Sequence, residues 1–178
     1  MEIQPHMRDP CRRIPETDAP PHPLEVMRQV FRAMQIPFQE DGGRLFTRLG
    51  LENVEVQVVA WGYPDDLAKV IVRLPVWAAR KHRAAAGDFL HRLNCNARRK
   101  YWEMDCDSGE IRLSCFTDTM VGRLTELHFR ALLNSLIHAA NTVFPYLTGV
   151  LHGRMPPEFA ADQAEASVRA DWKGRVEK

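Results

Sequence analysis

The sequence of 178 residues predicts an α+β fold, a mainly antiparallel five-stranded sheet with helices over one face. Apolar residues recur at helical spacing in three segments, and the runs between these segments alternate apolar and polar residues as strands do. Turn residues separate neighbouring runs, as in GYPDD at 62–66, which is typical of hairpins and hence of antiparallel pairing. The predicted element order is α-β-β-β-α-β-β-α.

The expected elements follow one another closely along the chain. A first helix begins at Pro23 and ends before Pro37, because proline is disfavoured inside a helix. The elements that follow are three strands at 44–49, 54–61 and 68–74, a helix at about 78–94, two strands at 101–106 and 110–116, and a helix at about 125–143. Pro145 is expected to bend or end this last helix.

The two ends of the chain differ from this middle part. Residues 1–22 are rich in proline and lack apolar periodicity, so we expect a flexible arm. Residues 23–153 are expected to form one domain. Residues 154–178 are polar and rich in alanine, and they fit either a terminal helix or a disordered tail.

Composition excludes several classes of protein. The chain is 45% hydrophobic and 26% charged, with a formal net charge of +1, which argues against a dedicated nucleic-acid or anionic-membrane binder. No apolar run approaches the roughly 18 residues of a membrane span. The N-terminal segment also lacks the apolar stretch of a secretory signal. Together with four cysteines, these features predict a cytoplasmic protein with free thiols.

Three of the four cysteines fall in FLHRLNCNARRKYWEMDCDSGEIRLSC, residues 89–115. His91 and Cys95 are four residues apart, a spacing that suits two metal ligands or a thiol dyad. On a helical wheel, however, both face solvent, whereas strand alternation places Cys106 and Cys115 on the apolar face. The four side chains cannot converge, so we expect no metal, no cofactor and no catalytic residue. A thiol or metal enzyme is the third reading.

A basic stretch covers residues 79–100, which hold seven lysines and arginines and one aspartate. A nucleic-acid-binding regulator that uses this basic second helix is the alternative function. Acidic residues follow immediately along the chain, so a solvated helix face or a docking face for an acidic protein segment explains the stretch better. We expect Arg80, Lys81 and Arg92 to contribute to protein binding in a secondary role.

The outer face of the predicted sheet is more informative. Val59 and Ile71 fall on the side of their strands opposite the main core, and Trp61 and Trp77 flank the same hairpin. Apolar residues on an otherwise polar face often mark an interface, although cross-strand packing in a twisted sheet explains them equally well. Val59, Trp61 and Ile71 are therefore the predicted protein-interaction residues.

The segment FLHRLNCN…YWEMDCDSGEIRLSC resembles the YbjN-type family of bacterial proteins, which are described as sensory transduction regulators. The resemblance covers about residues 23–152, and its motifs are Leu74-Pro75, Leu93-Asn94, the two strands and Gly turn of 101–116, and Phe144-Pro145-Tyr146. It implies a fold like that of type III secretion chaperones. It also implies a non-enzymatic function, protein binding and frequent dimerisation.

These observations predict a cytoplasmic bacterial protein-binding module, a regulator or chaperone-like protein, which is not an enzyme and acts as a homodimer. Its protein partner would dock an extended or helical segment on the outer sheet face or edge, steered by the basic helix. No membrane partner is expected. Asn94 is predicted to be structural, with an amide that satisfies backbone groups where the second helix ends.

Overall fold

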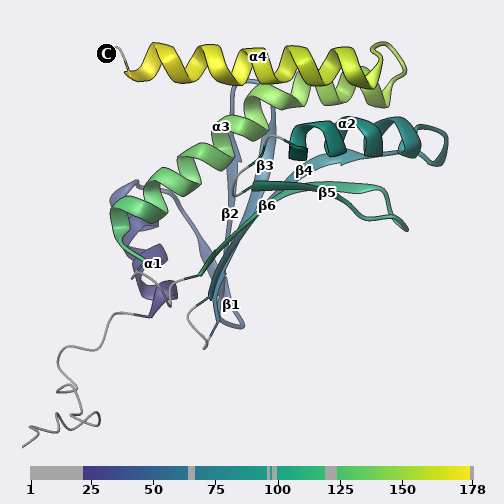
Figure 1. Ribbon diagram of the computed structural model, residues 1–178. Helices are drawn as coiled ribbons and strands as arrows, with labels where there is room; N and C mark the ends of the chain where they lie inside the picture. Colours follow the sequence, from purple (N-terminus) through teal and green to yellow (C-terminus); the bar gives the residue numbers. More distant parts are fainter. Residues whose placement is uncertain (1–21, 64–66, 96, 98–99, 119–123, 177–178) are drawn as a thin grey trace, which may run out of the picture.

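The computed structural model describes residues 22–63, 67–95, 97, 100–118 and 124–176. Six strands form one antiparallel sheet in the order β1-β2-β3-β4-β6-β5 (Figure 1). The strands are β1 Gln39–Asp41, β2 Arg44–Gly50, β3 Glu55–Gly62, β4 Leu67–Trp77, β5 Lys100–Met104 and β6 Glu110–Asp118. The predicted α+β class and the antiparallel pairing are confirmed, whereas the predicted number of five strands is wrong.

The additional strand is β1, which lies at one edge of the sheet. Its three residues, QED, are all exposed and show no alternation of apolar and polar side chains, so no sequence pattern marks it. It forms because Gly42 and Gly43 both take positive φ angles, +53° and +71°, and turn the chain back onto β2. Two positive φ angles in succession are typical of tight hairpin turns.

The helices lie over one face of this sheet in two layers (Figure 1). They are α1 Pro23–Ala33, α2 Arg83–Cys95, α3 Glu126–Leu151 and α4 Pro157–Val176, with a 3₁₀ turn at Arg80–His82 before α2. Helices α1 and α3 pack on the sheet, and Phe31 of α1 meets Phe129 of α3 with ring centroids 5.9 Å apart. None of the helices in the described residues is long and apolar enough to cross a membrane.

The alanine-rich C-terminal segment forms a helix, which decides between the two alternatives left by the sequence. Helix α4 packs across α3 and α2 as an outer layer. Its Ala160, Ala161 and Ala164 are buried and join the hydrophobic core. These small side chains let α4 approach α3 closely, so this segment contributes to the core of the domain. The predicted arm at residues 1–22 lies outside the described residues except for His22.

The sequence predicted that Pro145 bends or ends the helix; α3 continues through it to Leu151, so the expected end is wrong. Proline has no N–H to donate to the carbonyl four residues earlier, which is that of Asn141. Asn53, in the turn between β2 and β3, supplies the missing donor: its Nδ2 donates to the Asn141 carbonyl at 3.2 Å. The Asn53 N–H also donates to the Asn141 side-chain oxygen at 2.8 Å.

We expect Asn53→Ala to lower the free energy of unfolding by about 1 kcal/mol, because the Asn141 carbonyl loses its side-chain donor. Chemical denaturation measures this loss. Pro145→Ala restores a backbone N–H to the same carbonyl, so the cost of Asn53→Ala should shrink in the Pro145→Ala background. An undiminished cost in the double variant would contradict the role given to Asn53.

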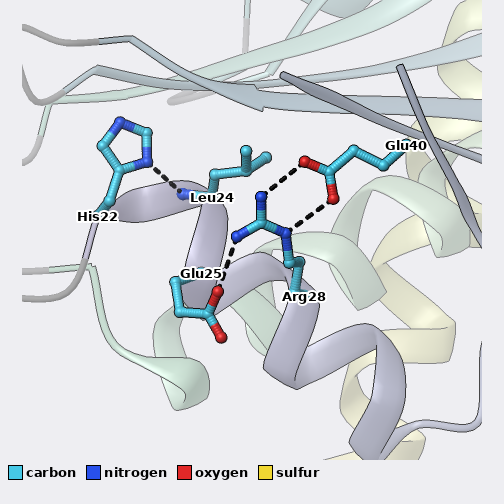
Figure 2. A network of polar contacts seen from close by, with 5 residues as sticks. All are labelled: His22, Leu24, Glu25, Arg28 and Glu40. Carbon is cyan, nitrogen blue, oxygen red and sulfur yellow. Dashed lines mark hydrogen bonds and ion pairs between the residues drawn. The ribbon is translucent and has the colours of Figure 1, made fainter. Parts of the chain in front are cut away.

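The edge strand β1 is held to α1 by an arginine with two carboxylate partners (Figure 2). Arg28 donates from Nε and Nη2 to Glu40 of β1 at 2.9 and 2.6 Å, and from Nη1 to Glu25 at 2.7 Å. The hydrogen bonds from Arg28 hold the pKa of the Glu40 carboxyl below its ordinary value. Helix α1 begins beside this network, where His22 Nδ1 accepts from the N–H of Leu24 at 3.2 Å.

Candidate functional site

The face of the sheet opposite the helices, here called the outer face, has no covering layer among the described residues (Figure 1). Strand pairing places one apolar row across its middle, with each residue directly opposite the next: Phe46, Val59, Ile71, Ser114 and Tyr101. The predicted residues Val59 and Ile71 are therefore cross-strand neighbours, as paired strands require. Neither belongs to the core beneath the helices.

Val59 and Ile71 are only 4% and 6% exposed, so side chains of the same face cover them. They form the floor of the outer face rather than its contact surface. Tyr101, at the end of the row, is 47% exposed. A bound molecule would touch the aromatic residues that surround the floor, and Val59 and Ile71 would support them.

A second row on the outer face combines aromatic rings and cations. It runs across the strands as Arg44, Trp61, Lys69 and Phe116. Lys69 Nζ lies 4.2 Å from the ring centroid of Phe116 and 5.4 Å from that of Trp61, and the Arg44 guanidinium lies 5.4 Å from Trp61. Such stacking holds the cations over the rings without neutralising their charge.

On the other side of the apolar row the side chains are mostly charged, and ion pairs neutralise part of this charge. Arg112 Nε donates to Glu103 at 2.7 Å, and the same carboxylate oxygen accepts from Ser114 Oγ at 2.8 Å. Arg73 forms a longer ion pair with Glu110, at 3.4 Å. A hollow of about 480 Å³ lies beside this pair, where its lining includes Trp77, which is 61% exposed.

Three cations of the outer face form no ion pair with any carboxylate in the described part of the chain: Arg44, Arg48 and Lys69. Arg48 also lines a second hollow, of about 380 Å³, between Phe38 and Phe46 near the β1 edge. The outer face thus presents aromatic side chains beside three cations that form no ion pair within the described residues, although Asp41 stands opposite Arg44 in the strand pairing.

The sequence identified the floor of this surface but not Phe46, Lys69 and Phe116, which surround it. The alternation of side chains along each strand would have identified these residues. Lys69 lies two residues before Ile71 and Phe116 two residues after Ser114, so each shares the outer face with its neighbour. The apolar pattern does not include Lys69, because it is charged, although its ammonium lies over the rings of Trp61 and Phe116.

The predicted secondary residues do not join this surface. Arg80 and Lys81 lie in the 3₁₀ turn before α2, and Arg92 lies on α2 itself, on the side of the sheet that the helices cover. All three are exposed. Arg92 is paired with Asp88 one helical turn earlier, at 3.0 Å. The structure therefore separates the two groups of predicted residues.

The remainder of the basic stretch is also dispersed. Arg83 donates to three backbone carbonyls, those of Ala78, Cys106 and Asp107, and so has a structural role. Lys100 is partly buried beneath the helices. Arg98 and Arg99 lie outside the described residues. The described members of the stretch do not form one continuous basic face, which weakens the nucleic-acid reading.

The cysteines are placed largely as expected, with one correction. Cys95 is exposed, with its sulfur 3.8 Å from His91 Nε2, and Cys115 is buried. Cys106 is exposed, so its predicted burial is wrong. Strand β5 ends at Met104, and the turn that follows takes Cys106 out of the strand alternation. Among the described residues, no group of three or more His, Cys, Asp or Glu side chains could hold a metal ion.

No family model matches the sequence, and no curated protein matches it either. Among solved structures, that of YbjN from E. coli, a proposed transcription regulator, matches with a TM-score of 0.48 and 12% identity, over 72% of this chain and 89% of that chain. The ExoT–SpcS complex from Pseudomonas aeruginosa contains a chain that matches with a TM-score of 0.43 and 20% identity, over 66% of this chain and 95% of that chain.

The structure therefore matches YbjN and the type III secretion chaperone SpcS at low sequence identity, as the resemblance of the sequence predicted. At these scores and identities the likeness concerns the arrangement of helices and strands, and it assigns no activity, site or partner to this chain.

Proposed function

We propose that this chain is a non-enzymatic protein-binding module, regulator or chaperone-like, whose outer face binds an acidic segment with apolar side chains from a partner protein. The observation that supports this proposal is the set of cations without an ion pair in the described residues, Arg44, Arg48 and Lys69, beside the exposed ring of Phe116 and the partly buried ring of Trp61 on an uncovered sheet face.

The aromatic side chains and the positive charges of the outer face would act together in recognition. Aromatic side chains such as Trp61 and Phe116 supply contact area with few torsions to restrict, which makes them common anchors of interfaces. Carboxylates of the partner would compensate the three cations, and this complementarity would set the orientation of the segment and speed its association. Val59 and Ile71 would hold the anchors in place from below.

The test begins with affinity capture from the native cell and mass spectrometry, followed by binding measurements with the purified partner. Trp61→Ala and Lys69→Glu should each weaken binding, by about tenfold or more, since each removes an anchor or reverses a charge at the centre of the surface. Raising the salt concentration should weaken the wild-type interaction.

Lys81→Glu is the matched control, because it reverses an exposed lysine on the helix-covered side of the sheet. It should leave binding unchanged. Equal losses from Lys69→Glu and Lys81→Glu would contradict the proposed surface and return the basic second helix to consideration. A partner whose binding segment carries no excess of acidic residues would also contradict it.

Homodimerisation forms the second part of the proposal, since a second copy could also cover the apolar row. Two identical outer faces would bring their uncompensated cations together, so salt should strengthen self-association and weaken binding of an acidic partner. Sedimentation at low and high salt measures this. A strict monomer at every salt concentration would remove the dimer and leave the partner-binding part intact.

Nucleic acid is the alternative ligand of the same surface, because exposed rings beside cations also suit single-stranded bases and phosphates. The carboxylates of Glu103 and Glu110 beside Arg112 and Arg73 oppose a continuous phosphate backbone more than a protein segment whose few carboxylates lie at Arg44, Arg48 and Lys69. We expect a single-stranded oligonucleotide such as (dT)20 to bind weakly at most. Tight, salt-sensitive binding of (dT)20 that is lost in Trp61→Ala would overturn the protein-binding proposal.

A further inference from the structure

Lys100 occupies an unusual position on the helix-covered face of the sheet. It stands at the β5 end of a row that continues through Cys115, Val70, Ala60 and Leu45, each opposite the next. The other four side chains of the row are fully buried, with at most 1% exposure. A lysine thus stands where the pattern of the row calls for an apolar residue.

Within the described residues, the ammonium group of Lys100 has one hydrogen-bond partner, Ser135 Oγ of α3, at 3.2 Å. It forms no ion pair with a carboxylate of the described residues. Burial therefore holds the pKa of Lys100 below its ordinary value. An ammonium has three donors, and Ser135 accepts from one of them in the described part of the chain.

A cavity of about 390 Å³, partly open to solvent and lined in part by Lys100, lies between α2, α3, α4 and β5. Most of its described lining residues are apolar: Leu93, Ala97, Trp102, Ala139 and Val143, with the partly buried Val168. Among the described lining residues, the charged groups besides Lys100 are Glu165 and Arg169, which pair with each other at 2.7 Å. An apolar cavity with a few convergent polar groups is the usual form of a small-molecule site.

We propose that this cavity binds a small monocarboxylate with an apolar body, whose carboxylate pairs with Lys100 and whose body lies against Trp102, Val143 and Val168. This site lies on the opposite side of the sheet from the outer face and does not depend on the proposed function. It is a ligand site in addition to the protein-binding surface.

Two features of the cavity select this class of ligand. Its volume is at the lower end of the range for small-molecule pockets, which favours a compact or short-chain body. Glu165 and Arg169 in its lining neutralise each other, so Lys100 leaves one positive charge, which a single carboxylate matches and a dianion exceeds. A neutral apolar molecule would fill the cavity but leave the Lys100 ammonium without a counter-charge.

The test compares octanoate with octan-1-ol on the full chain, by calorimetry and by the NMR shift of the Trp102 indole N–H. Octanoate should bind saturably and shift Trp102, and octan-1-ol should bind about tenfold more weakly, because it lacks the charge that pairs with Lys100. Lys100→Met keeps the volume of the side chain and should abolish the preference for octanoate. Its melting temperature should be raised, because no charge is buried.

Lys81→Met serves as the control, since it removes an exposed lysine far from the cavity, and it should leave octanoate binding unchanged. Ala139→Phe fills part of the cavity and should reduce binding of both probes, with the native fold checked by circular dichroism. Equal affinities for the two probes in the wild type would overturn the proposal. So would octanoate binding that survives Lys100→Met and disappears in Lys69→Glu, because the ligand would then lie on the outer face.

Discussion

Gly109→Ala is expected to lower the free energy of unfolding by about 2–5 kcal/mol, a large part of the stability of an ordinary domain. Gly109 precedes β6 and has a φ of +81°, where an L side chain is strained. A Cβ at this position would overlap the carbonyl oxygen of Ala78. The segment after β4 and the turn before β6 are also joined by a hydrogen bond from Ala78 N–H to the Gly109 carbonyl, at 2.8 Å.

Urea denaturation of Gly109→Ala and Gly43→Ala separates the strain of a positive φ angle from the overlap of the added Cβ with Ala78. Gly43 has a similar φ of +71°, but a Cβ there would meet no atom within 4 Å. Gly43→Ala should therefore cost only the conformational strain, about 1 kcal/mol. The difference between the two variants reports the overlap with Ala78. Equal costs would show that the chain before α2 shifts to admit the methyl group.

Asn94→Ala is expected to cost about 2–4 kcal/mol, because one side chain satisfies two backbone groups at a partly buried place. Asn94, at the end of α2, donates from Nδ2 to the carbonyl of Trp102 at 2.8 Å and accepts from the Trp102 N–H at 2.8 Å. Its amide thus takes the place of a further strand beside β5. This arrangement specifies the structural role that the sequence analysis predicted for Asn94.

Hydrogen exchange at the Trp102 amide is the direct measurement, since Asn94→Ala should reduce its protection more than that of amides in β3. Asn94→Asp is the matched variant, because it keeps the acceptor for the Trp102 N–H and loses the donor to the carbonyl. Asn94→Asp should therefore lower the free energy of unfolding by less than Asn94→Ala does. Unchanged protection of Trp102 in Asn94→Ala would show that water replaces the side chain without loss.

The elements that the sequence predicted well are those with long, regular patterns. The alternation of side chains around Val59 and Ile71 predicted which residues of β3 and β4 face the core and which face outward. The antiparallel pairing of these two strands was predicted from the short turn between them. Strand β1 could not be predicted, since its three polar residues are ordered by the glycine turn and by the Arg28–Glu40 contact. Short edge strands depend on such tertiary contacts more than on their own composition.

The errors at Pro145 and Cys106 have a different origin. The continuity of α3 depends on a donor from Asn53, which is distant in sequence, so the local signal of a proline was overridden. The burial of Cys106 depended on the length of a hairpin turn. Lys100 was predicted wrongly for another reason. It lies two residues before Trp102 and therefore on the core side of β5, whereas its positive charge is typical of a residue that faces solvent.

The strand order also has a kinetic consequence. Strands β1 to β4 pair with their neighbours in sequence, so three hairpins can form by short-range chain closure. Strand β6 must instead reach β4 across the segment that contains α2 and β5. Closing this longer loop costs more chain entropy before its contacts form. Strands β5 and β6 also form a hairpin by short-range closure, so the β4–β6 pairing that joins this hairpin to the first four strands should be the late, rate-limiting event in folding.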